Sequence, residues 1–242
     1  MKRIAAMAVA ADNRPRISVI VPALNESGTV QTTLRALQAL RERGHEVIVV
    51  DGGSTDDTVP CCRPLVDRVI RTSRGRARQM QAGAAQARGD IFWFLHADTV
   101  APQDADLAIL HALQHTRHHW GHFDVRFEER DPLLTLIAAA MNRRARVSRI
   151  ATGDQGLFVT RELFEHSNGF QQVPLMEDIA LSRSLKRRGP PVRIARMLTT
   201  SARRWKHQGI LKTVLLMWSL RLGYFLGASP ATLARYYRDT RA

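Results

Sequence analysis

Polar side chains follow three apolar runs of this 242-residue sequence, at positions where a metal ion or a phosphate could bind. The runs Ile17–Val21, Glu46–Val50 and Ile91–Leu95 are rich in β-branched and aromatic residues and predict buried strands. The segments PALNE, DGGSTDD and HADT follow them directly. In HADT, Asp98 and His96 indicate either a metal or phosphate site that lacks one of its usual carboxylates, or a turn that ends the strand.

The elements around these runs predict how the polar segments come together. Leucines recur at helical spacing within Asn25–Gly44, and a third strand over Arg68–Thr72 and a helix over Arg76–Arg88 follow. This alternation is typical of an α/β fold with a largely parallel sheet and helices on both faces. Because ligands bind at the carboxyl ends of parallel strands, we expect the three polar segments to line one site.

The second half of the chain alternates less regularly. Helices are expected over Asp104–His115, Pro132–Arg146, Asp178–Arg188 and Gly209–Leu226, and strands over Gly121–Phe127 and Leu157–Thr160. The last helix carries Lys212, Arg221 and an interrupting Gly223, so we do not interpret it as membrane-spanning. It is either a packing helix or an interfacial helix that rests on a membrane through Gly209–Leu226.

The composition indicates a soluble globular chain with an acidic partner. Lys and Arg number 36 against 22 Asp and Glu, a net charge of +14, and all but four of the basic residues are Arg. Such a surface suits a phosphorylated substrate, an anionic lipid surface or nucleic acid. Cys61 and Cys62 are adjacent and imply no disulfide framework, so a cytoplasmic location is expected. Residues 1–16 are interpreted as an N-terminal extension, since Met1–Ala11 is too short and weakly apolar for a signal peptide.

Four motifs in order carry a family resemblance. ISVIVPALNES, VIVVDGGSTDDT, FLHADT and the later MED together resemble an inverting family 2 glycosyltransferase with the GT-A fold, over residues 17–205. RGRARQMQAGAAQARGD, GDQG and SARRWKHQG resemble a compact bacterial subgroup named for arsenosugar biosynthesis. The resemblance implies a nucleotide-binding half over 17–100, an acceptor half over 101–205 and a helical appendage over 206–242.

The resemblance implies a nucleotide-sugar donor site in the first half. The residues it assigns to donor binding are Pro22, Ala23, Asn25, Glu26, Asp51, Arg76, Gln79, Ala97 and Asp98. Asp51 would accept the N3–H of uracil or thymine, which favours a UDP- or dTDP-sugar. Alternatively Asn25 or Ser27 caps a helix, Asp51 is a turn residue, and the arginines near Arg76 form a solvated basic face.

The resemblance also implies a divalent cation, Mg²⁺ or Mn²⁺, that bridges the two phosphates of the donor. Asp98 stands at the last position of the family's D-x-D turn, and His96 stands where the first Asp would be. His96 is therefore a metal ligand, a contact to the sugar, or a packed imidazole. One carboxylate suffices when phosphate oxygens and waters complete the coordination.

The second half would hold the acceptor and the general base. The resemblance gives the base role to Asp178, with Glu177 orienting the acceptor or exchanging roles with it; the alternative is that both acids stabilise a helix N-terminus. Gly153, Asp154 and Gln155 would contact the acceptor or the sugar. Arg204 would neutralise the diphosphate and Trp205 would stack on a sugar, unless the two are a core pair at a strand edge.

These assignments predict an enzyme that transfers a sugar from a nucleotide diphosphate sugar to an acceptor hydroxyl with inversion. The acceptor, a small molecule or a lipid-linked one, is not specified by the sequence. A sugar nucleotidyltransferase is the alternative, but PALNES lacks the glycine-rich basic loop it would need. A nucleic-acid-binding protein is less favoured, because the arginines are dispersed and no recognition helix emerges. The expected location is the cytoplasm, with the inner face of the plasma membrane as the place for peripheral contact.

Overall fold

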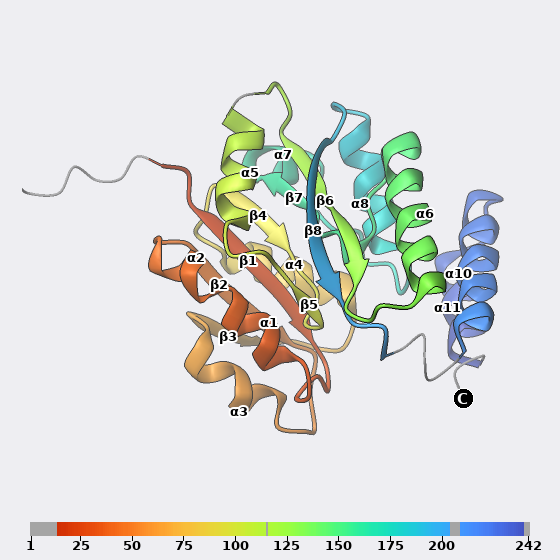
Figure 1. Ribbon diagram of the computed structural model, residues 1–242, viewed down its shortest axis with the longest axis horizontal. Helices are drawn as coiled ribbons and strands as arrows, with labels where there is room; N and C mark the ends of the chain where they lie inside the picture. The colour runs from red at the N-terminus through yellow and green to blue at the C-terminus, as the bar shows by residue number, and fades with distance from the viewer. Residues whose placement is uncertain (1–13, 115, 204–208, 240–242) are drawn as a thin grey trace, which may run out of the picture.

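The computed structural model describes residues 14–114, 116–203 and 209–239. One sheet of eight strands forms the centre of this part of the chain (Figure 1). The strands are β1 (Ile17–Ala23), β2 (Glu46–Asp51), β3 (Arg68–Arg71), β4 (Ile91–Phe94), β5 (Thr99–Val100), β6 (Trp120–Phe127), β7 (Phe158–Thr160) and β8 (Val192–Thr200).

The helices flank this sheet. They are α1 (Val30–Ala36), α2 (Gln38–Glu42), α3 (Thr58–Cys62), α4 (Arg76–Gln86), α5 (Ala105–Gln114), α6 (Pro132–Ser148), α7 (Arg161–His166), α8 (Glu177–Lys186), α10 (Ile210–Phe225) and α11 (Pro230–Asp239). Two short 3₁₀ helices, η1 (Arg63–Leu65) and η2 (Gly153–Gln155), lie in the connections.

The strand order is β3-β2-β1-β4-β7-β6-β8-β5. The first four strands are parallel, β7 is antiparallel to both β4 and β6, β6 and β8 are parallel, and β5 pairs antiparallel with β8. The expected α/β class with a mostly parallel sheet is therefore confirmed. Since β1, β2 and β4 run in the same direction side by side, the loops after them lie at one edge of the sheet.

Two apolar layers hold the helices on the sheet. One layer joins alternate strand residues such as Val19 and Val21 to α1, α2 and α5, and the other joins Ile20 and Ile48 to α4, α7 and α8. The continuous β-branched runs follow from this arrangement, because each central strand is buried on both faces.

The helix expected over Asn25–Gly44 begins later than predicted. Asn25 adopts a left-handed conformation (φ 53°), and the amide of Thr29 bonds to the carbonyl of Glu26 in a turn, so α1 begins at Val30. The N-cap position of α1 is Thr29, whose side chain makes no capping hydrogen bond, and the alternative that Asn25 or Ser27 caps the helix is wrong. The strand β8 was not predicted, because its alternation of apolar and polar residues breaks after Ile194, where the pairing with β6 shifts register.

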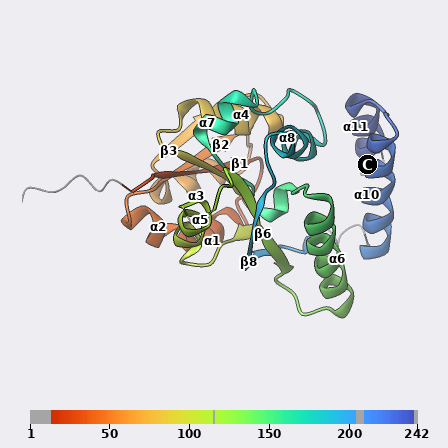
Figure 2. The same ribbon diagram turned by 90° about the horizontal axis from the view of Figure 1, so that it is seen from above.

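The C-terminal helices α10 and α11 lie beside α6 and α8 at one side of the molecule (Figure 2). Leu216, Leu220 and Leu233 pack there against Ile150 and Ile179. Among the described residues, no helix is both long enough and apolar enough to cross a membrane. The proposed division into an extension, two halves and an appendage stays a prediction.

Candidate active site

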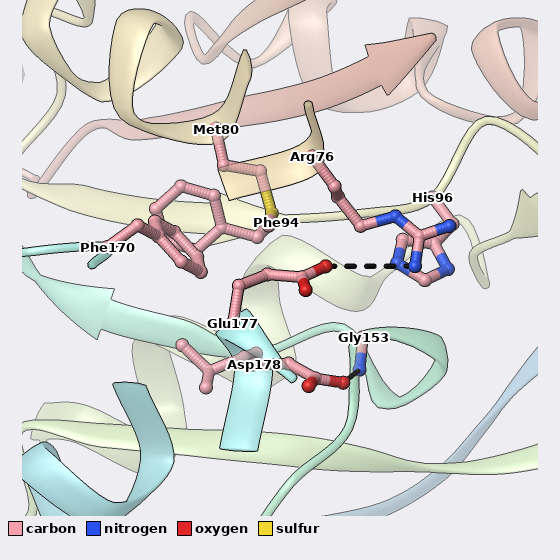
Figure 3. Close-up of a pocket in the computed structure, with 9 residues that line it drawn as sticks. Arg76, Met80, Phe94, His96, Gly153, Phe170, Glu177 and Asp178 are labelled. Carbon is pink, nitrogen blue, oxygen red and sulfur yellow. Dashed lines mark hydrogen bonds and ion pairs between the residues drawn. The ribbon is translucent and has the colours of Figure 1, made fainter. Parts of the chain in front are cut away.

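The acidic pair Glu177–Asp178 begins α8 and faces a small pocket (Figure 3). The preceding residue, Met176, has φ 67°, and this left-handed step turns the chain into the helix. The pocket is lined by Arg76, Met80, Phe94, His96, Gly153, Leu157, Phe170, Glu177 and Asp178. The structure thus brings together the start of α4, the end of β4, η2 and the start of α8. Five of the lining residues were predicted as site residues, namely Arg76, His96, Gly153, Glu177 and Asp178.

Glu177 is 4% exposed and faces Arg76, with 3.7 Å between its Oε1 and the Nη1 of the arginine. Burial raises the pKa of Glu177, the charge of Asp178 raises it further, and the charge of Arg76 opposes both. The Arg76 side chain stays 43% exposed. Glu177 therefore holds a proton to a higher pH than an ordinary glutamate does.

Asp178 is half-buried and is fixed by two backbone donors. Its Oδ2 accepts from the amide of Gly153 at 2.7 Å, and its Oδ1 accepts from the amide of Ile179 at 2.7 Å. These bonds use one lone pair on each oxygen, and a carboxylate offers about four acceptor positions. A fixed, partly accessible carboxylate at the rim of a pocket has the properties that a general base needs.

His96 links the turn after β4 to η2. Its Nδ1 lies 3.1 Å from Oδ1 of Asp154, and its buried Nε2 has no hydrogen-bond partner among the described residues. A Cβ built on Gly153 would lie 2.3 Å from this Nε2, so only glycine fits there. Nδ1 of His96 thus helps to position η2, and the prediction that His96 is a metal ligand, a contact to the sugar or a packed imidazole stays open.

Gln155 is fully buried and organises η2. Its Oε1 accepts from the amide of Thr152 at 3.2 Å and from Nη2 of Arg144 at 3.2 Å. Sequence reasoning missed Arg144, which comes from α6. It falls three residues after the buried Met141 on that helix, and this spacing could have indicated its inward direction.

The loops after β1 and β2 are tied to each other by their polar side chains. Asp51 is buried and accepts from the amides of Gly53 and Ser54 at 3.3 and 3.0 Å, and Oδ1 of Asn25 accepts from the amide of Thr55 at 2.9 Å. Both side chains therefore have a structural role, and a contact with a nucleotide would be additional.

The Glu26 side chain contacts the segment that follows β8. Its Oε2 accepts from Arg203 at 2.7 Å and from the Thr29 hydroxyl at 3.1 Å. This ion pair joins the loop after β1 to the segment after β8. Arg204 and Trp205, which were expected beside the diphosphate and the sugar, lie outside the described residues.

Gln79, Ala23 and Pro22 form the floor beneath these loops. The Gln79 side chain is buried, and its Nε2 donates to the carbonyls of Ala23 and Val50 at 2.8 and 2.9 Å. The carbonyl of Ala23 also accepts from the amide of Gly52. Pro22 is buried within β1, opposite Val50. Gln79 and Ala23 thus hold these loops in place, and the assignment of Gln79, Ala23 and Pro22 to donor binding stays a prediction.

Asp98 lies in the turn between β4 and β5 and is half-buried. Its backbone carbonyl accepts from the amide of Ser201, while none of the described residues donates to its carboxylate. The neighbouring Ala97 is buried, and its carbonyl accepts from the Thr33 hydroxyl at 2.9 Å. Within the described ranges there is no cluster of three or more His, Cys, Asp or Glu side chains that could hold a metal by itself.

The sheet and its polar edge define an α/β enzyme of the GT-A type, with its site at the carboxyl ends of parallel strands. The family described as Glycosyl transferase family 2 matches residues 18–170, more than half of the chain. The chain belongs to this family.

Individual proteins resemble the chain in part. An uncharacterized glycosyltransferase of Mycobacterium tuberculosis, Rv1514c, is 38% identical over 105 residues, which cover 41% of this chain and 40% of that protein. Staphylococcus aureus TarS in complex with UDP-GlcNAc has a TM-score of 0.63 at 17% identity, over 78% of this chain and 59% of that one. Pyrobaculum calidifontis mannosyltransferase PcManGT with GDP-Man and Mn²⁺ has a TM-score of 0.61 at 21% identity, over 88% and 62%. At these identities the two structures show a shared fold.

Proposed function

We propose that this chain transfers a sugar with inversion from a nucleotide diphosphate sugar to an acceptor hydroxyl. The observation that carries the proposal is the placement of Asp178, fixed by the Gly153 amide at the rim of a pocket that also holds Arg76 and Glu177. We include in this proposal that the chain belongs to a compact subgroup related to arsenosugar biosynthesis, which the sequence motifs support.

In this mechanism Asp178 takes the proton of the acceptor hydroxyl as its oxygen attacks the anomeric carbon. The new bond to the acceptor oxygen forms while the bond from the sugar to the diphosphate breaks on the opposite face, which inverts the anomeric centre. Glu177, beside it, orients the acceptor. Arg76, which is 3.7 Å from Glu177 and partly exposed, would offer a positive charge to the leaving diphosphate.

The donor nucleotide would lie over the loops after β1 and β2, with Asn25, Glu26 and Asp51 within its reach. Asp51 would accept a hydrogen bond from the N3–H of uracil or thymine, which favours UDP or dTDP. The PcManGT structure contains GDP-Man, so guanine nucleotides are tested as well.

A divalent cation, Mg²⁺ or Mn²⁺, fits the residues present through Asp98. Its carboxylate receives no hydrogen bond from the described residues, and such cations use one or two carboxylates with phosphate oxygens and waters. When bound there, the cation would offset the charge of the diphosphate. His96 could supply only Nε2 to such a site, since its Nδ1 lies 3.1 Å from Oδ1 of Asp154.

A thermal-shift screen of UDP-, dTDP- and GDP-sugars, with and without Mn²⁺, tests the donor assignment. We expect one nucleotide to raise the melting temperature, with a further increase on adding Mn²⁺ that Asp98→Ala abolishes. The absence of a shift with every nucleotide would contradict the proposed function.

We also propose that α10 rests on an anionic membrane surface. Leu215, Trp218, Leu222 and Phe225 lie along one face of this helix and are 69%, 66%, 60% and 53% exposed. This spacing gives one continuous apolar stripe, opposite the face that packs on the domain.

A basic cavity lies at the end of the stripe. It is lined by Ile150, Arg183, Lys186, Arg187 and Phe225, and the Arg183 guanidinium lies 5.4 Å from the centre of the Phe225 ring. An apolar stripe beside clustered cations matches a bilayer that contains anionic lipids.

Sedimentation with vesicles tests this contact. We expect binding to phosphatidylglycerol vesicles, weaker binding to phosphatidylcholine vesicles, and loss of binding in a Trp218→Ser, Leu222→Ser double variant. Leu107→Ser is the matched control, because Leu107 is 46% exposed on α5. Equal binding of the double variant and the control would contradict the proposal.

A further inference from the structure

Three buried N–H donors, on α6, η2 and α10, have no hydrogen-bond partner among the described residues. They are Nε of Arg144, Nε2 of Gln155 and Nε of Arg221. Buried donors in native proteins are nearly always paired, and an unpaired one that carries charge is especially costly. Three such donors around one short segment indicate a ligand that supplies the acceptors.

Arg144 and Gln155 hold each other in place. Nη2 of Arg144 donates to Oε1 of Gln155 and to the Thr152 hydroxyl, both at 3.2 Å. Oε1 of Gln155 also accepts from the amide of Thr152. Because these contacts fix the amide oxygen, the amide nitrogen of Gln155 cannot turn to another acceptor without breaking them.

Arg221 reaches the same place from α10. It lies four residues after Met217 and three before Tyr224, and both of these pack against a cluster that contains Ile150 and Met176. These two cluster residues precede Thr152 and Asp178 by two positions each. The fold of the C-terminal helices thus brings a second guanidinium to the junction of η2 and α8.

The two guanidiniums form a partly buried pair of like charges. Burial, and after it the charge of Arg221, lowers the pKa of Arg144 to about 10, although the charges of Asp178 and Asp154 oppose this shift. An anion placed between the arginines would relieve their repulsion and satisfy the unpaired donors. Planar guanidinium groups match both phosphate and carboxylate in geometry.

We propose that Arg144, Arg221 and Gln155 bind an anionic group, a phosphate or a carboxylate, that is carried by the acceptor. The assignment to the acceptor rests on the proposed function, in which Asp178 is the base. The Gly153 amide ties Asp178 to the helical turn that contains Gln155. An anion held there would therefore place the rest of the acceptor beside the base.

Titration calorimetry with the full chain tests the site. Inorganic phosphate and, separately, acetate are titrated into the protein alone and into protein saturated with UDP and Mn²⁺. We expect at least one anion to bind in both conditions, and the one that binds more tightly identifies the acceptor group as phosphate or carboxylate. Arg144→Gln and Arg221→Gln should each weaken that binding by about 10- to 100-fold, as expected for the loss of a charge-assisted hydrogen bond.

Arg143→Gln is the matched control, because Arg143 precedes Arg144 on α6 but is exposed. Arg144→Lys keeps the charge while losing the planar donors, so intermediate weakening is expected, and this variant serves if Arg144→Gln fails to fold. Anion binding that is unchanged in both Gln variants would overturn the inference. Displacement of the anion by UDP would also overturn it, since the arginines would then serve the diphosphate of the donor. Anion binding that the Gln variants lose, in a protein that does not bind UDP, supports the site while contradicting the proposed function.

Discussion

At the ends of β1 and β2, the polar side chains of Asn25, Asp51 and Gln79 all have hydrogen-bond partners within the chain. Around η2 and α8 the opposite holds: Glu177 is buried as a carboxyl with a raised pKa, and Arg144 and Gln155 bury donors that no described residue satisfies. The first region is complete by itself, whereas the second is arranged for groups that the chain does not supply.

This difference has a physical reading. Natural sequences are locally consistent except where function requires otherwise, and the exceptions are held in place by the surrounding structure. The donor loops use their polar groups to define a shape over which a nucleotide can lie. The region of η2 and α8 keeps buried donors without a partner among the described residues, so we expect chemistry and discrimination between acceptors to be concentrated there.

Asp178→Asn should cause the largest effect. Loss of the general base is expected to lower the transfer rate by about 10²- to 10⁴-fold, while UDP binding stays unchanged because the donor loops are untouched. Initial rates of nucleotide release with acceptor, together with calorimetry of UDP, measure both quantities.

The control for this prediction is Asp57→Asn. Asp57 is an exposed carboxylate at the start of α3 that makes no side-chain cap. If Asp178 only stabilised a helix N-terminus, the two variants would lose similar, small amounts of stability and keep their activity. Equal activity of the two variants would remove the proposed contrast between the regions.

Gly153→Ala should damage both stability and activity. The new Cβ would lie 2.3 Å from Nε2 of His96, and relieving this clash moves η2 and the amide that fixes Asp178. We expect a loss of about 1–3 kcal/mol in the free energy of unfolding, as for other overpacked sites, together with a lower transfer rate. Gly189→Ala is the control, because a Cβ there meets no atom within 4 Å. Urea unfolding curves that match for the two variants would show that His96 moves aside freely.

The contrast between the regions also explains how far the sequence could be read. The parallel half of the sheet and the acidic pair were predictable, because continuous apolar runs and their polar ends are local signals. The hydrogen bonds of Gln79 to backbone carbonyls were not predicted, because a helical position indicates a face but not which groups the side chain meets there. Arg144 and Arg221 were not predicted as members of the proposed anion site, since tertiary packing brings α6 to η2 and α10 to α6 and α8.

Gln79→Met tests whether the donor side is a scaffold. Methionine fills a similar volume but leaves the carbonyls of Ala23 and Val50 without their donor, so a loss of about 1–3 kcal/mol in the free energy of unfolding is expected. Gln86→Met, at an exposed position of the same helix, should change stability little. The affinity for UDP should fall modestly, because the loops after β1 and β2 would shift. A large loss of UDP affinity at unchanged stability would instead make Gln79 a direct contact and weaken the contrast.

Glu177→Gln should have the smallest effect, and its sign depends on pH. Because the pKa of Glu177 is raised in the folded state, the folded protein binds more protons than the unfolded one between the ordinary glutamate pKa, about 4.3, and the raised value. The contribution of Glu177 to the free energy of unfolding therefore falls as the pH rises through that interval. A glutamine at this position does not titrate.

The stability of Glu177→Gln relative to the wild type should accordingly increase with pH, at no more than about 1.4 kcal/mol per pH unit, and then level off. Urea unfolding of both proteins from acid to neutral pH measures this difference. Glu162→Gln, at an exposed glutamate on α7, should give a flat difference. If Glu177→Gln instead lost stability as the pH rose, its ion pair with Arg76 would outweigh the cost of burying the carboxylate, because the charged form would then be the one that the fold favours. In that case the acidic pair, like the polar side chains of the donor loops, would have its partners within the chain. The contrast between the two regions would then be limited to Arg144 and Arg221.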